Sequence, residues 1–400
     1  MDLKSGYPFW PIKHGLLHTY PRLQQDLTCD VVVIGGGITG ALVAYHLVEA
    51  GLETVVLDKR HIAWGSTSAT TALLQYEIDT PLCDLIDLVG EDHAARSYLA
   101  CIDAIDKIDA LVHKLDNPCG FERRPSLYVA SYKSHVPALK REYAARQKHG
   151  IALAWFEQKT IEDHYAFSRP AALFSMVGAQ VDAYQLTHTL LQAAMQQGLQ
   201  VYDRTEVTQI DHTPRRVQLT TAQGQTVKAR YLVFASGYES QRYLKQPVAN
   251  LISTYALISE PMQIAQGWYE RSLIWESARP YFYLRTTADG RVMMGGEDED
   301  FRDPVRRDKL IPRKTERLQH KFKALFPHLD LEVAFAWAGT FGETKDGLAY
   351  IDQSPDLPHS WFALGYGGNG ITYSILAAEI IRDAIRRHPN PYADLFRFDR

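Results

Sequence analysis

Three glycines close to the start of the chain have the spacing of a phosphate-binding turn. The stretch "CDVVVIGGGITGALVAYHL" (29–47) runs from apolar residues into Gly35, Gly37 and Gly40, the pattern G-x-G-x-x-G. In this pattern the first glycine allows a tight turn, the second lets the backbone approach a pyrophosphate, and the third lets a helix pack on a strand. The N-terminus of the following helix presents unpaired N–H groups to the phosphates. The motif therefore predicts that the chain binds a dinucleotide.

A carboxylate follows at the place where a ribose would lie. A strand pattern over 30–34, a helix pattern reaching about residue 50, and the strand "TVVLD" ending at Asp58 begin a β-α-β unit. Asp58 can accept hydrogen bonds from ribose hydroxyls, and an acid at this position disfavours a 2′-phosphate. These residues predict binding of an ADP group, but they do not distinguish FAD from NAD.

Two other segments favour FAD. The segment "RHIAWGSTSATTALLQYE" (60–77) is too polar for a simple crossover helix, so we expect it to lie along a cofactor; a plain Ser/Thr turn is the alternative. The segment "GYGGNGIT" (365–372) begins a second helix, whose positive dipole end could stabilise the negative charge of a reduced flavin; a tight turn is the simpler interpretation. A chain that bound only NAD(P) would leave both segments without a role.

The composition is that of a globular protein with two domains. The chain has 400 residues, of which 46% are hydrophobic and 22% charged, and its net charge is −4; this length exceeds the usual size of one core. The absence of a basic excess argues against a nucleic-acid partner, and no apolar run is long enough for an integral membrane segment. We expect no signal peptide, four reduced cysteines and hence a cytoplasmic protein. His14 and His18 lack a third ligand nearby, so no metal site is predicted.

Strand and helix patterns alternate through the rest of the chain. Residues 1–28 are expected to form an arm that packs on the body, and an "ADG" turn within 251–300 predicts a hairpin in an antiparallel sheet. The sequence thus predicts an α/β fold, with a Rossmann-like FAD-binding domain and a second, α+β substrate domain built on an antiparallel sheet. The other predicted elements are two helices within 82–115, a strand over 124–131, a helix over 135–150, a helix and two strands over 181–210, a strand over 231–237, and a strand, glycine turn and helix over 361–385.

Taken together, several segments resemble the glycine/D-amino acid oxidase (DAO) family of FAD-dependent oxidoreductases. They are "DVVVIGGGITG" with "VVLDKR", "AWGSTSAT", "VDAYQLTHTLLQAAMQQG", "YLVFASGY", "YFYLRTTADGRVMMGGE", "WAGTFGETKDGLAYID" and "FALGYGGNGI". The resemblance covers nearly the whole chain and implies that FAD lies extended between two domains. It implies a FAD-binding domain of residues 1–84, 176–245 and 333–400, and a substrate domain of residues 85–175 and 246–332.

The resemblance also implies which residues would hold FAD. The glycine turn and Asp58 would bind ADP, Ser66 and Thr67 would reach the pyrophosphate, and the backbone of Val207 would meet the adenine. Residues 368–372 would face the flavin ring. The full predicted set is Gly35, Gly37, Ile38, Thr39, Gly40, Asp58, Lys59, Gly65, Ser66, Thr67, Thr70, Thr71, Val207, Ala235, Ser236, Gly237, Gly339, Gly368, Asn369, Gly370, Ile371 and Thr372.

Three departures from the family pattern concern the substrate, the electron acceptor and the flavin linkage. Many members bind the substrate carboxylate with an Arg where this chain has Phe341, so an amino acid substrate would need another cation, such as Arg285. Sarcosine-oxidase-like members activate oxygen with a Lys where this chain has Met293, so either oxygen or another acceptor is expected. No Cys lies in "FGETKDG", so the resemblance implies non-covalent FAD.

Candidate substrate-binding residues lie directly after the flavin loop and on two predicted strands. The segment "LLQYEID" (73–79) offers carboxylates that could bind a cationic amine or could lie in a solvated turn. Two residues that alternate on one strand face, at 283 and 285, could both point into a cavity; a salt bridge at the rim is the alternative for the second. The acids of "GGEDEDFRD" (295–303) are expected in a solvated loop. The candidates are Gln75, Tyr76, Glu77, Tyr283, Arg285 and Phe341.

Oxidation of a C–N bond is the leading functional hypothesis, with hydride transfer to flavin N5 and hydrolysis of the imine. The expected partners are a small-molecule amine or amino acid and an electron acceptor. Hydride transfer requires orientation and a deprotonated amine more than a strong protein base, so no catalytic triad is expected. The alternatives are a FAD-dependent 2-hydroxy acid dehydrogenase on the same scaffold and a flavin-binding subunit without activity of its own.

Overall fold

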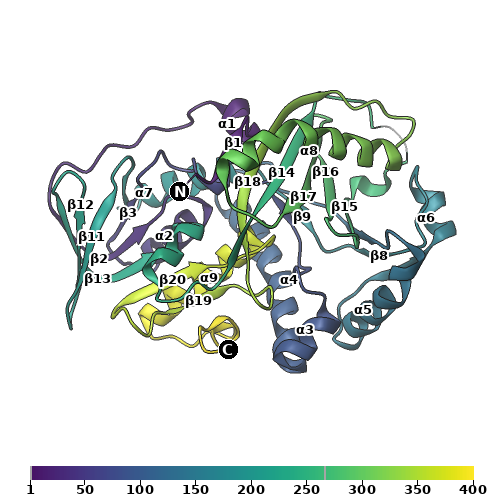
Figure 1. Cartoon of the computed structure of the whole chain (residues 1–400). Helices are drawn as coiled ribbons and strands as arrows, with labels where there is room; N and C mark the ends of the chain where they lie inside the picture. The colour runs from purple at the N-terminus through teal and green to yellow at the C-terminus, as the bar shows by residue number, and fades with distance from the viewer. Residues whose placement is uncertain (1, 265–266) are drawn as a thin grey trace.

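Two β-sheets form the framework of the molecule. The computed structural model of the chain describes residues 2–264 and 267–400. Figure 1 shows one sheet at the left and the other at the right, with helices packed around and between them. Each sheet draws its strands from segments that are far apart in the sequence.

The first sheet contains the predicted dinucleotide-binding strands. Its path is β10-β3-β2-β13-β12-β11, and β20 joins it by pairing with β13 and with β19. β10, β3, β2, β13 and β20 run parallel to one another, as predicted for a Rossmann-like domain, while β12 and β19 pair antiparallel with β13 and β20. The strands are β2 (Leu27–Ile34), β3 (Thr54–Leu57), β10 (Gln200–Tyr202), β11 (Val207–His212), β12 (Val217–Thr221), β13 (Thr226–Phe234), β19 (Tyr350–Gln353) and β20 (Ser360–Leu364).

Both faces of these parallel strands are buried. Val31 and Val33 of β2 belong to one core cluster, while Val32 and Ile34 belong to another, because successive side chains of a strand point to opposite faces. A parallel strand covered on both faces is apolar throughout, which accounts for the unbroken run "VVVI". The first cluster includes the helices α2 (Ile38–Glu49), α7 (Ala183–Met195) and α9 (Gly370–Arg386).

The second sheet is mostly antiparallel and follows the path β1-β18-β14-β17-β16-β15-β6-β8-β7. One parallel pair, β15 with β6, joins its two antiparallel parts. Its strands are β1 (Lys4–Gly6), β6 (Ser126–Val129), β7 (Ala154–Glu157), β8 (Ala171–Ser175), β14 (Asn250–Ser259), β15 (Leu273–Glu276), β16 (Phe282–Thr286), β17 (Val292–Glu299) and β18 (Val333–Glu343).

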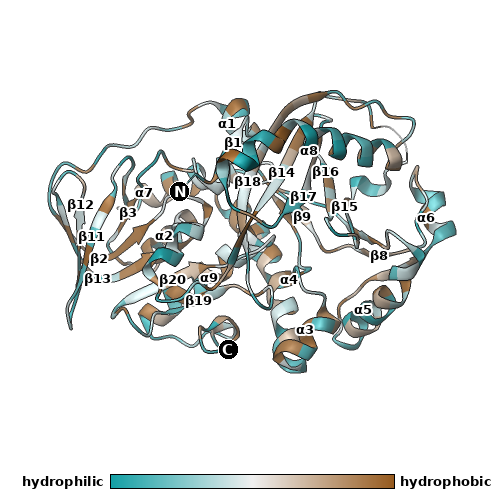
Figure 2. Cartoon of the chain, in the orientation of Figure 1, coloured by the Kyte–Doolittle hydropathy of each residue, from teal (hydrophilic) through white to brown (hydrophobic). Residues whose placement is uncertain are grey.

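The helix α8 (Pro304–Leu325) covers one face of this second sheet, and its position was not predicted from the sequence. Asp303 caps its N-terminus by accepting the N–H of Arg306, and Pro304 occupies the first helical position. The apolar positions that face the sheet, Leu318 and Phe322, are few. Figure 2 shows α8 as mostly hydrophilic, in contrast to the apolar β2, and this polar character explains why periodicity did not reveal it.

The remaining elements surround the two sheets. Within residues 2–264 and 267–400, none of the helices combines the length and the apolar character needed to cross a membrane. A small third sheet has the order β4-β9-β5. These elements are α1 (Phe9–His14), β4 (Leu73–Leu74), α3 (Leu82–Val89), α4 (Glu91–Lys114), β5 (Glu122–Arg123), α5 (Val136–Lys148), α6 (Gln158–His164) and β9 (Ala179–Gln180).

The structure confirms the predicted α/β fold and most of its elements. The break between α3 and α4 falls at Gly90, as predicted, and the "ADG" turn joins β16 to β17. The N-terminal arm packs on the body through the buried Phe9 and Trp10. The prediction of a solvated loop over 295–303 is wrong for residues 295–299, which continue β17, whereas residues 300–303 form a largely exposed loop.

The division into two domains remains a prediction. The strands of the first sheet come from the segments predicted for the FAD-binding domain, and most strands of the second sheet come from those predicted for the substrate domain. The two exceptions are β1 and β18, which come from segments assigned to the FAD-binding domain but lie in the second sheet. β18 pairs with β14 along its whole length, and its antiparallel backbone hydrogen bonds hold it in the second sheet. β1 pairs with β18, so the residues of β1 are fixed to the second sheet as well.

Candidate active site

The glycine turn between β2 and α2 has the close contacts that its motif predicts. Gly35 has φ 112°, a conformation that side chains rarely adopt, and a Cβ there would lie 2.5 Å from the Ala235 carbonyl oxygen. A Cβ on Gly40 would lie 1.8 Å from the Gly35 carbonyl oxygen, and one on Gly37 would lie 2.9 Å from Thr67 Oγ1. Only glycines therefore allow this helix to begin so close to β2 and to the following loop.

Asp58, at the end of β3, supports the same turn. Its two carboxylate oxygens accept the N–H groups of Gly36 and Arg60, each at 2.7 Å. Burial raises the pKa of the Asp58 carboxyl, and these two N–H donors oppose that rise. The carboxylate also lines the cavity described next, where its remaining lone pairs are free to meet a ribose.

A cavity of about 260 Å³ runs from the glycine turn to the second sheet. Asp58 lines it on the side of the first sheet, and Tyr283 and Phe341 line it on the side of the second. Of the residues predicted to hold FAD, those that line it are Gly35, Gly37, Ile38, Thr39, Asp58, Lys59, Gly65, Ser66, Thr67, Thr70, Thr71, Val207, Ala235, Ser236, Gly237, Gly339, Gly368, Gly370 and Ile371.

Three predicted residues act behind the cavity wall. Gly40 makes the helix contact described above. Asn369 donates its side-chain amide to the carbonyls of Gln75 and Glu77, at 3.0 and 2.9 Å, and Thr372 donates its hydroxyl to the Asn369 carbonyl. Asn369 and Thr372 thus shape the start of α9, and none of the three residues lines this cavity.

The loop after β3 is held along the cavity by three side chains. Thr67 Oγ1 accepts the N–H of Ile38 at 3.0 Å, and the indoles of Trp10 and Trp337 donate to the carbonyls of Thr70 and Ala69 at 2.7 and 2.8 Å. Because these donors come from α1, α2 and β18, the loop is fixed between both sheets. Its Ser and Thr residues at positions 66, 67, 70 and 71 thereby line the cavity.

Asp79, one of the carboxylates that the segment 73–79 offers, fixes the second glycine turn, a contact that the sequence did not predict. Its Oδ2 accepts the N–H of Gly368 at 2.8 Å, and a Cβ on Gly367 would lie 2.1 Å from the same oxygen. The glycines of "GYGGNG" therefore leave room for a carboxylate that comes from another segment. The sequence shows that an acid stands at position 79, but only the folded chain shows that this acid contacts the glycine turn at 367–368.

A second cavity, of about 120 Å³, adjoins the first. Thr70, Thr71, Leu73, Tyr283 and Gly368 line both, so the two cavities share one wall. The polar and aromatic residues that line the second cavity also include Gln75, Glu77, Asp79, Tyr128, Trp275, Glu276, Arg279 and Tyr281.

Comparison with known proteins decides which cofactor and family this arrangement represents. The family model "DAO: FAD dependent oxidoreductase" matches residues 30–384. The chain belongs to this family. FAD is its cofactor, and the glycine turn, the N-terminus of α2 and the long cavity fit the group.

Individual relatives and solved structures agree with the DAO assignment. The chain is 27% identical to the gamma-glutamylputrescine oxidoreductase of Escherichia coli (strain K12), over 95% of this chain and 87% of the relative. It is 25% identical to a glycine oxidase of Bacillus licheniformis, over 90% and 94% of the two chains. The crystal structure of glycine oxidase from Geobacillus kaustophilus matches 92% of this chain and 98% of its own, with a TM-score of 0.77 and 19% identity.

The structure brings together four of the six candidate substrate residues of this DAO protein. Gln75, Glu77 and Tyr283 line the second cavity, while Phe341 lines the first. Arg285 lines neither of these two cavities, because its guanidinium turns back to the Thr71 carbonyl at 2.7 Å and to Gln180 at 3.0 Å. Arg285 therefore stabilises the loop after β3, through Thr71.

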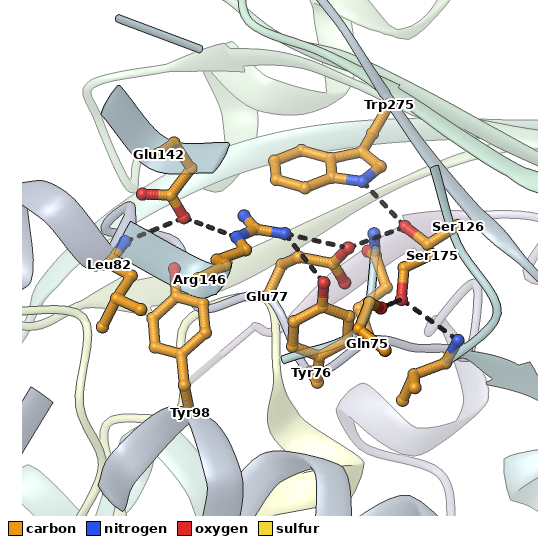
Figure 3. Close-up of polar contacts among 12 residues, drawn as sticks. Gln75, Tyr76, Glu77, Leu82, Tyr98, Ser126, Glu142, Arg146, Ser175 and Trp275 are labelled. Atoms are coloured by element: carbon orange, nitrogen blue, oxygen red, sulfur yellow. Dashed lines mark hydrogen bonds and ion pairs between the residues drawn. The ribbon is translucent and has the colours of Figure 1, made fainter. Parts of the chain in front are cut away.

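Tyr76, the sixth candidate, lines neither cavity and lies in a buried polar network behind the second one (Figure 3). Its hydroxyl accepts Arg146 Nη1 at 3.0 Å, and Arg146 Nε donates to Glu142 at 2.7 Å. On the cavity side, Trp275 Nε1 donates to Ser126 Oγ at 3.2 Å, and Ser126 Oγ donates to Glu77 at 2.9 Å. The network links a wall of the second cavity to α5.

Electrostatics in this network centre on Arg146. Arg146 and the carboxylates of Glu77 and Glu142 have side chains only 1–2% exposed. Burial raises the pKa of Glu77, and the nearby Arg146 opposes that rise. Glu142 also accepts the backbone N–H groups of Leu82 and Cys83, which begin α3, so the same carboxylate caps a helix.

The acidic segment that was expected in solvent is partly buried against α8. Glu297 is 3% exposed and lies 3.5, 3.3 and 3.1 Å from the cationic groups of Lys314, Arg317 and Lys321. A register shift between β14 and β17 falls at this point, so the next acid, Asp298, faces elsewhere. Ion pairing to a helix that periodicity did not reveal explains why the loop prediction failed.

Asp298 should make stability depend on pH. Burial raises the pKa of its carboxyl to about 7, with a contribution from the charge of Glu343. A folded pKa above the unfolded value means that this group lowers stability as pH rises from about 4 to about 7. We expect Asp298→Asn to raise the free energy of unfolding by roughly 1–2 kcal/mol at pH 8, allowing for partial exposure, and to have little effect near pH 3.5, below the unfolded pKa. Urea unfolding at both pH values measures this difference; an equal change at both would contradict it.

Proposed function

We propose that this protein oxidises the C–N bond of a small amine or amino acid. The observation that carries the proposal is the second cavity, which is lined by Glu77, Asp79 and Glu276. It shares a wall with the first cavity, which we call the FAD cavity because we place the cofactor there. A carboxylate at this place favours a substrate that carries a basic nitrogen. Similarity to proteins named gamma-glutamylputrescine oxidoreductase and glycine oxidase supports the same reaction class.

The residues of the two cavities would bind and orient the substrate. When bound, FAD accepts a hydride at N5 from the carbon next to the amine nitrogen. Tyr283 and Gly368 lie on the shared wall, so a substrate held in the second cavity would meet the first cavity there. The aromatic rings of Tyr128, Trp275 and Tyr281 would exclude water and restrict the orientation of the substrate. Hydrolysis of the imine product then releases an amine or ammonia.

Anaerobic reduction of the protein-bound flavin tests this proposal. We expect at least one member of a panel of primary amines, secondary amines and amino acids to bleach the flavin absorbance, and an amine or ammonia to be released in equal amount. Bleaching only by 2-hydroxy acids, without nitrogen release, would instead identify a hydroxy acid dehydrogenase. Bleaching that required a second protein would identify a flavin-binding subunit.

The electron acceptor and the compartment also belong to the proposal. Met293 is fully buried in the core, and we propose that oxygen or another acceptor reoxidises the flavin without a basic residue at that position. All four cysteines of the chain are free thiols in the structure. Free thiols are typical of a reducing compartment, which supports the proposal that the protein acts in the cytoplasm.

A further inference from the structure

One carboxylate oxygen of Glu77, a residue that lines the second cavity, has no hydrogen-bond partner. Glu77 Oε1 accepts Ser126 Oγ at 2.9 Å and lies 3.5 Å from Arg146 Nη1. Glu77 Oε2 is buried and makes no hydrogen bond, and the side chain is only 2% exposed. A buried carboxylate oxygen that is left unsatisfied is costly, so a cation bound in the cavity beside Glu77 would offset that cost.

The charges behind this wall do not balance. Arg146 is the cation shared by Glu77 and Glu142, so two buried carboxylates face one guanidinium (Figure 3). Glu142 is satisfied by Arg146 and by the N–H groups of Leu82 and Cys83. The surplus negative charge therefore belongs to Glu77, on the side of the cavity. A cation in the cavity would balance it.

A second carboxylate lies on the same cavity, nearer to FAD. Asp79 accepts the N–H of Gly368, a residue of the shared wall, and within the described parts of the chain no cation lies within ion-pair distance of it. The other acid of the cavity, Glu276, is already paired with Lys321 at 3.2 Å. Arg279 also lines the cavity, and its positive charge opposes the rise that burial causes in the pKa of Asp79; it is exposed, forms no ion pair with Asp79, and its guanidinium lies 4.9 Å from the centre of the Tyr281 ring.

We propose that the second cavity binds its substrate as a cation, with Glu77 and Asp79 as the two carboxylates that hold the ammonium group until it passes its proton to one of them, because hydride transfer needs the neutral amine. The inference rests on the proposed function and narrows it to amines without a carboxylate on the reacting carbon. The aromatic rings of Tyr128, Trp275, Tyr281 and Tyr283 add cation–π attraction, as in other sites for organic cations. Phe341 agrees with this substrate class, because it lines the FAD cavity with an apolar ring where a carboxylate substrate would need a cation.

Three probes of the same shape test the charge preference without any turnover. The tert-butylammonium ion has no hydrogen on the carbon next to nitrogen, so it cannot be oxidised; pivalate and tert-butanol are its anionic and neutral counterparts. We expect tert-butylammonium to perturb the visible spectrum of the FAD-loaded protein and to bind at least about tenfold more tightly than either counterpart. Tighter binding of pivalate, or equal binding of the cation and the alcohol, would overturn the proposal.

Two conservative variants test whether Glu77 and Asp79 cause the preference for a cationic ligand. Glu77→Gln and Asp79→Asn should each reduce the ratio of tert-butylammonium to tert-butanol affinity at least about tenfold, while Glu162→Gln, an exposed acid on α6, should leave it unchanged. The ratio cancels any general loss of cavity structure. An unchanged ratio in both would refute the assignment. If the protein binds the cation but oxidises no amine in the panel, the cation site is supported and only the proposed function is refuted.

Discussion

The Arg146→Met variant is expected to lose about 3–5 kcal/mol of unfolding free energy, because it removes one partner from a buried ion-pair network. Glu77 and Glu142 would then be buried carboxylates with no cation, each with a side chain 2% exposed. The variant also removes the donor to the Tyr76 hydroxyl. Methionine keeps the side-chain length and the packing against neighbouring rings, so the loss reports charge more than volume.

Urea unfolding measures this loss, and pH provides a check on its cause. Without Arg146, burial should place the folded pKa of both carboxyls above the unfolded value of about 4.5. The variant then loses stability as pH rises through that range, so its deficit relative to the unmodified protein should shrink toward pH 5. Arg141→Met, on the same helix with a side chain 69% exposed, is the matched control and should change stability by less than about 0.5 kcal/mol. A similarly small effect at Arg146 would contradict the prediction.

Gly40→Ala is expected to abolish FAD binding at micromolar cofactor. The new Cβ would lie 1.8 Å from a backbone carbonyl of the glycine turn, which cannot move aside as a flexible side chain would. Relief of the collision requires α2 to move away from β2, and the N–H groups at its N-terminus then leave the phosphate position. We expect FAD affinity to fall at least about 100-fold, which corresponds to about 2.8 kcal/mol.

Titration of the apoprotein with FAD, followed by flavin fluorescence, measures this change. Gly51→Ala is the control, because Gly51 follows the C-terminal end of the same helix with φ 78° and a Cβ there would have nothing within 4 Å. It should lose about 1 kcal/mol of stability through backbone strain and retain its FAD affinity. Retention of FAD by Gly40→Ala would show that the helix tolerates a shift.

Local patterns in the sequence were sufficient to predict the cofactor site. The glycine turn, Asp58 and the Ser/Thr loop lie within one β-α-β unit and the loop after it, where spacing along the chain nearly equals spacing in the fold. The parallel strands were equally legible, because burial on both faces leaves an unbroken apolar run. Helix α8 was missed because its exposed face dominates its composition.

The substrate side of the site depended on contacts that the sequence does not display. Arg146 and Glu77 meet although they are 69 positions apart in the chain, and Asp79 and Gly368 meet across a separation of 289. The strand alternation of Tyr283 and Arg285 was correctly inferred, but the length of the arginine let it turn toward Thr71 and Gln180. Charge balance in a buried network is a property of the folded chain, so the unpartnered oxygen of Glu77 could be found only there.

The FAD cavity joins the two ends of the polypeptide, and this affects how it can form during translation. Leu3 lines the cavity beside β1, and β1 pairs with β18. Ile371, at the start of α9, lines the same cavity. Because a ribosome releases Leu3 long before Ile371, a nascent chain lacks part of this cavity lining until the start of α9 has emerged. The full set of cavity contacts therefore forms only when these two distant segments meet in the folded chain.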